Sequence, residues 1–184
     1  MLELTNINST FNLNNGVKIP CVGYGTFRTP ADVAEQAVKE AIETGYRHID
    51  TAAVYGNEEA VGKGIKDSGI KREDLFVTSK LWNTNRGYEQ TKKAFQETLD
   101  RLQMDYLDLY LIHWPANEKQ FGDDAAKINA ETWRAMEDLY NEGKIRAIGV
   151  SNFMPHHIAE LMKTAKVAPA VDQIEVHPGW PHTE

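Results

Sequence analysis

The sequence has almost no cysteine, no long apolar run and no excess of positive charge. Cys21 is its only cysteine, which excludes an intrachain disulfide framework and is typical of a reducing compartment. No stretch approaches the ~18–20 apolar residues of a membrane-spanning helix. Lysine and arginine number 20 against 27 acidic residues, giving a net charge of −7. This balance argues against binding to nucleic acid or to an anionic membrane, since both need clustered positive charge.

The remaining composition is that of an ordinary soluble protein. The chain has 184 residues, of which 41% are hydrophobic and 26% charged. That length fits one domain, residues 1–184, and is enough to bury a real core. The first residues lack the basic region and apolar stretch of a secretory signal, so we expect a cytoplasmic protein.

Strand-like and helix-like segments alternate along the chain. A hairpin of residues 10–13 and 17–20 is indicated by Asn14-Asn15-Gly16, which accept the positive φ of a tight turn. Strands are then expected at residues 22–26, 48–51, 75–80, 106–113, 145–150 and 170–176, and helices at 30–45, 58–68, 88–102, 131–141 and 155–166. This alternation predicts an α/β fold with right-handed crossovers and a parallel sheet.

Two parallel topologies compete, an open doubly wound sheet and a closed (β/α)8 TIM barrel. The open nucleotide-binding sheet usually carries G-x-G-x-x-G between a strand and a helix. Residues 23–28 read GYGTFR and place Arg28 where the third glycine should stand, and Gly62-Lys63-Gly64 falls within a predicted helix. The sequence therefore favours the barrel, represented by the hairpin and about six β-α units.

Titratable side chains stand at the ends of three consecutive predicted strands. Asp50, Lys80 and His113 occupy these ends, and Tyr55 follows Asp50 by five residues. Active-site residues of a barrel come from the C-terminal ends of its strands, and three neighbouring ends fall within roughly 10 Å. Each residue taken alone has a structural reading: a turn cap for the aspartate, a solvated charge for the lysine, a hydrogen-bonded core imidazole for the histidine. Their conjunction predicts a catalytic cluster.

The chemistry of this cluster follows from its ionisation. A tyrosine has a pKa near ~10 and is a poor acid at neutral pH unless a nearby cation favours its phenolate. Lys80 is expected to supply the cation, Asp50 to compensate the buried ammonium, and His113 to orient a substrate oxygen. Such a set donates a proton to an oxygen that gains negative charge, with no metal. This describes carbonyl reduction, for which a hydride donor is still needed.

Three segments resemble the aldo-keto reductase family: residues 45–58 (GYRHIDTAAVYGNE), 107–115 (LDLYLIHWP) and 143–153 (GKIRAIGVSNF). The resemblance extends over essentially the whole chain. The sequence is similar in particular to small bacterial reductases that act on keto-sugar acids, methylglyoxal and other aldehydes. It implies a TIM-barrel oxidoreductase that uses NADPH, with NADH not excluded, to reduce aldehyde or ketone carbonyls. Tyr55 then resembles the general acid, Lys80 and Asp50 the pair that lowers its pKa, and His113 the orienting residue.

The same resemblance implies residues that bind the cofactor and the substrate. Ser151, Asn152 and Gln173 look like the partners of the nicotinamide carboxamide. The cofactor-binding set is completed by Gly25, Thr26, Phe27 and Asp50. Phe27, Trp82, His113 and Trp114 resemble the substrate pocket, although packing at the barrel top is an alternative role for the tryptophans. We expect no metal site, a small-molecule carbonyl substrate and a monomer.

The family's barrel has eight β-α units and typically ~250 residues. Residues 1–184 supply about six units, so we expect an incomplete barrel that lacks the basic cluster for the adenosine 2′-phosphate. Two functions remain open. The chain is the catalytic part of a reductase, or it is a catalytically inactive fragment or cofactor-sensing subunit of the same fold.

Overall fold

A curled sheet of six parallel strands forms the centre of the molecule, whose computed structural model describes residues 4–181. Its strands, in spatial and chain order, are β3 (Tyr24–Gly25), β4 (His48–Asp50), β5 (Phe76–Leu81), β6 (Leu107–Ile112), β7 (Ile145–Ser151) and β8 (Asp172–Gln173). Each strand pairs with the next one along the chain, without the reversal of a doubly wound sheet. The predicted barrel topology is therefore confirmed. Within the described residues, β3 and β8 each pair with one neighbour.

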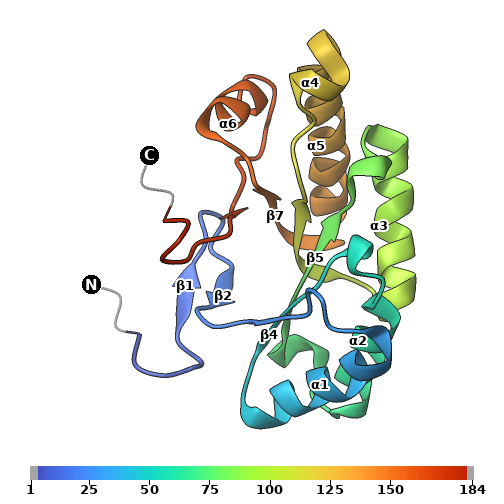
Figure 1. Ribbon diagram of the computed structural model, residues 1–184, viewed down its shortest axis with the longest axis vertical. Coiled ribbons are helices and arrows are strands. Elements are labelled where there is room, and N and C mark those ends of the chain that lie inside the picture. Colours follow the sequence, from blue (N-terminus) through green and yellow to red (C-terminus); the bar gives the residue numbers. More distant parts are fainter. Residues whose placement is uncertain (1–3, 182–184) are drawn as a thin grey trace.

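Helices cover the outer face of this sheet. They are α1 (Ala31–Thr44), α2 (Glu58–Asp67), α3 (Tyr88–Leu102), α4 (Glu118–Phe121), α5 (Ala125–Asn141) and α6 (Pro155–Leu161). Figure 1 shows α1, α2, α3 and α5 side by side on one side of the sheet. The outer core lies between these layers and includes Val77, Tyr110 and Ile148. Gly45 ends α1 in a left-handed conformation (φ 116°), as its sequence position predicts.

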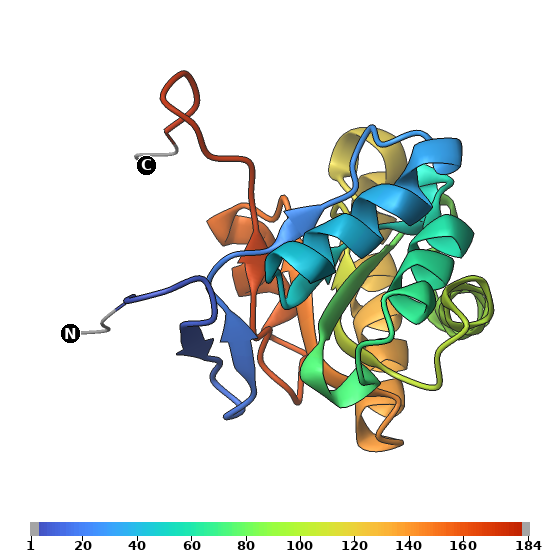
Figure 2. The same ribbon diagram turned by 90° about the horizontal axis from the view of Figure 1, so that it is seen from below.

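The N-terminal hairpin covers the concave inner face. Its strands, β1 (Thr10–Asn12) and β2 (Lys18–Pro20), are antiparallel and are joined by a turn with Gly16 at φ 84°. Apolar side chains from both sides form a second core. Its members are Phe76, Leu109, Leu111 and Ala147 from the sheet, Leu13, Val17 and Ile19 from the hairpin, and Ala170 and Val171 from the segment before β8. Burial on both faces explains why β5 and β6 are buried at every position. Figure 2 shows the hairpin on the side of the sheet opposite the helices.

The segment before residue 131 corrects the sequence prediction. No helix was predicted between residues 113 and 131, but α4 and the first turns of α5 are helical. Alanine, glutamate and lysine are strong helix formers, so local propensity favours helix even though the segment is polar. Tertiary contacts fix it, since the buried Asn129 side chain bonds both the N–H and the carbonyl of Ala116. α6 also ends at Leu161, earlier than predicted, and β8 is only two residues long.

Glycines inside α2 allow the helices to pack closely. A Cβ placed on Gly62 would lie 2.4 Å from the carbonyl oxygen of Leu102 in α3. One placed on Gly64 would lie 2.4 Å from the carbonyl oxygen of Glu35 in α1. These glycines therefore belong to helix packing, as expected once they were excluded from a phosphate-binding loop. Among residues 4–181, no helix has the length and apolarity needed to cross a membrane.

We predict that Gly62→Ala lowers the free energy of unfolding by about 1–3 kcal/mol, because the backbone of α3 must move away from the new methyl group. Helix propensity alone predicts the opposite sign, a gain of about 1 kcal/mol. Denaturant unfolding measures the difference, with Lys66→Ala on the exposed face of α2 as the control. An unchanged or higher stability for Gly62→Ala would contradict the close packing.

Candidate active site

A cavity of about 1150 Å³ runs from the hairpin along the concave face to the C-terminal ends of the strands. Most side chains predicted from the sequence line it. These are Gly25, Phe27, Asp50, Tyr55, Trp82, His113, Trp114, Ser151, Asn152 and Gln173. Lys80 and Thr26 are fully buried behind its wall. The structure thus brings the predicted residues together at one end of the sheet.

Lys80 is the buried charge at the centre of this group, with 1% of its surface exposed. Its ammonium lies 2.5 Å from Asp50 Oδ1 and donates a hydrogen bond to the carbonyl oxygen of Thr51 at 3.1 Å. It also lies 3.4 Å from the hydroxyl of Tyr55. Burial lowers the pKa of Lys80, while Asp50 acts in the opposite direction. Lys80 does not line the cavity, but it contacts Asp50 and Tyr55, which do.

Tyr55 stands on a short 3-10 turn, η1 (Ala53–Tyr55), that follows β4. Burial, with a further contribution from the Asp50 carboxylate, raises the pKa of Tyr55 to about 12. The lowering of this pKa that was expected from Lys80 is not found. The ammonium is 2.5 Å from Asp50 but 3.4 Å from the phenol, so its charge is largely neutralised before it acts on Tyr55. The phenol therefore carries its proton throughout the physiological pH range.

His113 lies just beyond the end of β6, and its ring packs edge-on against two aromatic rings. The ring centroids are 5.8 Å from Tyr55 and 5.3 Å from Trp82. Burial, together with the positive charge of Lys80, lowers the pKa of His113 to about 4. The imidazole is therefore neutral at pH 7 and offers one N–H donor. Its Nδ1 atom is buried without a hydrogen-bond partner among the described residues.

Hydroxyl and amide side chains continue the site at the ends of β7 and β8. Ser151 Oγ donates to the backbone oxygen of Gln173 at 2.7 Å, and Gln173 Nε2 donates to Asp50 Oδ2 at 2.9 Å. Asn152 adopts a left-handed conformation (φ 61°) and donates from Nδ2 to the backbone oxygen of His113 at 2.9 Å. The last two bonds use the NH2 groups, so the amide oxygens are acceptors suited to a ligand N–H.

The loop after β3 forms another part of the wall. Phe27 is 64% exposed, and its ring centroid is 5.1 Å from that of Tyr55. Thr26 is fully buried, and its Oγ1 has no hydrogen-bond partner among the described residues. Buried Asn57 donates from Nδ2 to the carbonyl oxygens of Thr26 and Thr29, at 3.0 and 2.9 Å. This asparagine holds the loop after β3 against the turn that carries Tyr55.

The two tryptophans lie on the loops that follow β5 and β6. Trp82 is half-buried against His113, whereas Trp114 is 46% exposed. Arg86 joins their loops, since it donates to the carbonyl oxygens of Asn83, Trp114 and Pro115 at 3.0–3.1 Å. Neither Arg86 nor Asn57 was predicted from the sequence to have a role in the site. Both side chains bond to backbone carbonyls of another loop, and an arginine or asparagine in a sequence gives no sign of such partners.

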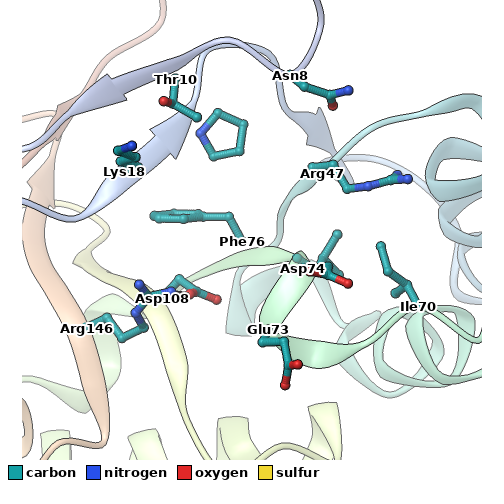
Figure 3. A pocket seen from close by; sticks show the side chains of 12 residues that line it. Asn8, Thr10, Lys18, Arg47, Ile70, Glu73, Asp74, Phe76, Asp108 and Arg146 are labelled. Atoms are coloured by element: carbon teal, nitrogen blue, oxygen red, sulfur yellow. Dashed lines mark hydrogen bonds and ion pairs between the residues drawn. The ribbon is translucent and has the colours of Figure 1, made fainter.

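A smaller cavity of about 370 Å³ lies at the opposite, N-terminal ends of the strands (Figure 3). Asp108 and Arg146 point toward one another there. The fully buried Asp108 carboxylate pairs with Arg72 and Arg146, each at 2.7 Å, and accepts the Val77 N–H at 2.9 Å. Its charge is thus satisfied within the protein, and the arrangement is that of a structural ion pair. No group of three or more potential metal ligands occurs in the part of the chain that the structure describes.

The chain is similar to a known protein family and to several curated proteins. The model of the Aldo/keto reductase family matches residues 21–183. The chain is 54% identical over 175 residues to a glyoxal reductase of Bacillus subtilis, covering 95% of this chain and 60% of that protein. It is 52% identical over 168 residues to a 9,11-endoperoxide prostaglandin H2 reductase of Trypanosoma cruzi, covering 90% and 56%.

Solved structures give the same result. An aldo/keto reductase from Brucella melitensis matches with a TM-score of 0.90 at 48% identity, covering 96% of this chain and 65% of that one. A Bombyx mori aldo-keto reductase in complex with NADP matches with a TM-score of 0.83 at 44% identity, covering 91% and 58%. The chain spans about 60% of the length of the curated relatives that it matches. The family model, the curated relatives and the solved structures agree, and the chain belongs to the Aldo/keto reductase family.

Proposed function

We propose that the protein containing this chain is an NADPH-dependent reductase of aldehyde and ketone carbonyls, with Tyr55 as the general acid. The observation that carries the proposal is the placement of a protonated phenol over a buried ion pair, next to a neutral imidazole, in one large cavity. The family membership and the reductase names of the relatives support it.

The proton inventory of the site fits this reaction. Tyr55 keeps its proton at neutral pH because its pKa is about 12. An alkoxide is more basic than a phenolate, so transfer of that proton to the oxygen of a reduced carbonyl is favourable. The neutral ring of His113 donates a hydrogen bond that orients the carbonyl oxygen. The Lys80 ammonium, 3.4 Å from the Tyr55 hydroxyl, then donates a hydrogen bond to the phenolate that remains, and Asp50 holds that ammonium in place.

The cavity fits a nicotinamide cofactor. His113 Nδ1 is buried without a partner among the described residues, and His113, Asn152 and Gln173 all line the cavity. Thr26 Oγ1, behind the cavity wall, also lacks a partner there. A planar carboxamide has both donors and an acceptor, which hydroxyl and amide groups can match. We assign Ser151, Asn152 and Gln173 to the nicotinamide carboxamide, and Gly25, Thr26, Phe27 and Asp50 to the nearby cofactor surface. When bound, NADPH supplies the hydride.

The substrate pocket is built from aromatic walls. Phe27, Trp82 and Trp114 line the cavity beside Tyr55 and His113, which favours a small aldehyde or ketone with an apolar part. The glyoxal reductase name of one relative supports small dicarbonyl compounds as first candidates. We also propose that the protein acts in the cytoplasm as a monomer.

We predict that a chain extended to the length of its relatives oxidises NADPH in the presence of methylglyoxal or a nitrobenzaldehyde, and that the 184-residue chain does so far more slowly. The decrease in absorbance of NADPH measures both rates, and the titration of NADPH fluorescence measures binding. Equal turnover by both chains would show that residues 1–184 suffice. Lack of turnover by the extended chain, with NADPH still bound, would favour a cofactor-sensing subunit.

Tyr55→Phe should lower kcat by about 10²–10⁴-fold, because general acid catalysis contributes on that scale. The ring remains, so the dissociation constant for NADPH should change less than about twofold. Steady-state kinetics and fluorescence titration of the extended chain measure the two effects. Near-normal kcat in Tyr55→Phe would exclude Tyr55 as the acid.

The pKa of His113, lowered to about 4, predicts a pH effect on stability. The folded state binds this proton less readily than the unfolded state, whose histidine pKa is near 6.5. His113 therefore contributes stability above pH 6.5 that is lost as the pH falls toward 4. The free energy of unfolding should decrease more steeply across this window in the native chain than in His113→Gln. Parallel pH dependences would contradict the lowered pKa.

A further inference from the structure

A buried carboxylate lies three residues beyond Tyr55 and is not part of the proposed proton chemistry. Glu58 begins α2, and only 1% of its surface is exposed. Its Oε1 accepts a hydrogen bond from Ser79 Oγ at 2.6 Å, and its Oε2 accepts one from Arg101 Nε at 2.7 Å. A buried charge is expensive unless it is paired, so these two bonds fix the carboxylate firmly.

The partners of Glu58 belong to β5 and α3. Ser79 is fully buried in β5 and directly precedes Lys80. Arg101 lies near the end of α3. The chain from Tyr55 to Glu58 contains only Gly56 and Asn57, so a fixed Glu58 leaves the turn little freedom. The Glu58–Ser79 bond thus connects the segment that carries Tyr55 to the strand that carries Lys80.

We propose that Glu58 is a positioning residue which, through its buried bond to Ser79, sets the separation between the Tyr55 hydroxyl and the Lys80 ammonium. The bond to Arg101 holds α2 against α3, whereas the bond to Ser79 reaches β5. The carboxylate also supports the charged form of Lys80, whose pKa it raises against the effect of burial. The inference rests on the proposed role of Tyr55 as the acid, but the geometry can be tested without any reaction.

The test is the rate at which tetranitromethane nitrates Tyr55, followed by peptide mass spectrometry on the 184-residue chain. This reagent attacks the phenolate, and one unit of phenol pKa changes the phenolate fraction tenfold at fixed pH. Freeing the turn exposes the phenol to water and moves the pKa of Tyr55 from about 12 toward its ordinary value of 10.0. Glu58→Gln should therefore nitrate about tenfold faster at Tyr55, with Tyr46, which is also partly buried, as the reference within the same molecule.

Two further variants separate positioning from general stability. Ser79→Ala keeps the Glu58 charge and the bond to Arg101 but removes the connection to β5, so it should also accelerate nitration of Tyr55. Glu59→Gln changes the neighbouring, exposed residue of the same helix turn and should leave the rate unchanged. Thermal unfolding of each variant gives the fraction folded under the nitration conditions.

The outcomes are distinct. Faster nitration of Tyr55 relative to Tyr46 in both Glu58→Gln and Ser79→Ala supports the proposal. An unchanged Tyr55 rate in folded Ser79→Ala, which removes the bond to Glu58 outright, overturns it. If Glu58→Gln does not fold, the Ser79→Ala result decides by the same criterion.

In the extended chain, Glu58→Gln should lower kcat about tenfold with NADPH binding unchanged. Nitration requires neither cofactor nor substrate, so an inactive chain would count against the proposed function and not against this inference.

Discussion

The buried ammonium group of Lys80 needs compensating partners, and this need determines the arrangement of side chains at the C-terminal ends of the strands. Lys80 points from a fully buried strand into a region where water cannot reach it, and an uncompensated charge there would destabilise the fold. Compensation requires Asp50 from β4, the carbonyl of Thr51 and the hydroxyl of Tyr55. The need to satisfy one cation therefore brings together the side chains that can move a proton.

The sheet supports this arrangement because it is buried on both faces. The helices pack against its convex face and the hairpin against its concave face, so β5 and β6 have no solvent-facing positions. Parallel register then brings the ends of β4, β5 and β6 to one edge. Rigid strands hold Asp50 and Lys80, whereas the residues on loops need separate anchors. Asn57 holds the turn of Tyr55, and Arg86 holds the loops of the tryptophans.

The charged and polar groups of the site also affect one another's pKa values. Because Asp50 neutralises Lys80 at 2.5 Å, little positive charge is left to act on Tyr55, and burial dominates the phenol. The same burial, with the lysine nearby, keeps His113 neutral. At pH 7 the phenol of Tyr55 is therefore protonated and the adjacent imidazole of His113 is neutral. Both groups can then donate a hydrogen bond, as the proposed reduction of a carbonyl requires.

The amino-acid sequence was enough to predict the order of the strands and longer helices, a barrel instead of a doubly wound sheet, and the cluster of Asp50, Tyr55, Lys80 and His113. These follow from local patterns, since hydrophobic periodicity and the positions of polar residues at strand ends are set within short segments. The residues expected around the cofactor and substrate came instead from the resemblance to the aldo-keto reductase family. The raised pKa of Tyr55, the helical start of α5 and the contacts of Asn57, Glu58 and Arg86 could not be predicted in this way and become visible in the folded molecule. Each depends on distances between segments far apart in the chain: Lys80 to Asp50, Asn129 to Ala116, or Glu58 to Ser79. A carboxylate in the sequence does not reveal its burial or its partner, and those two properties decide what it does.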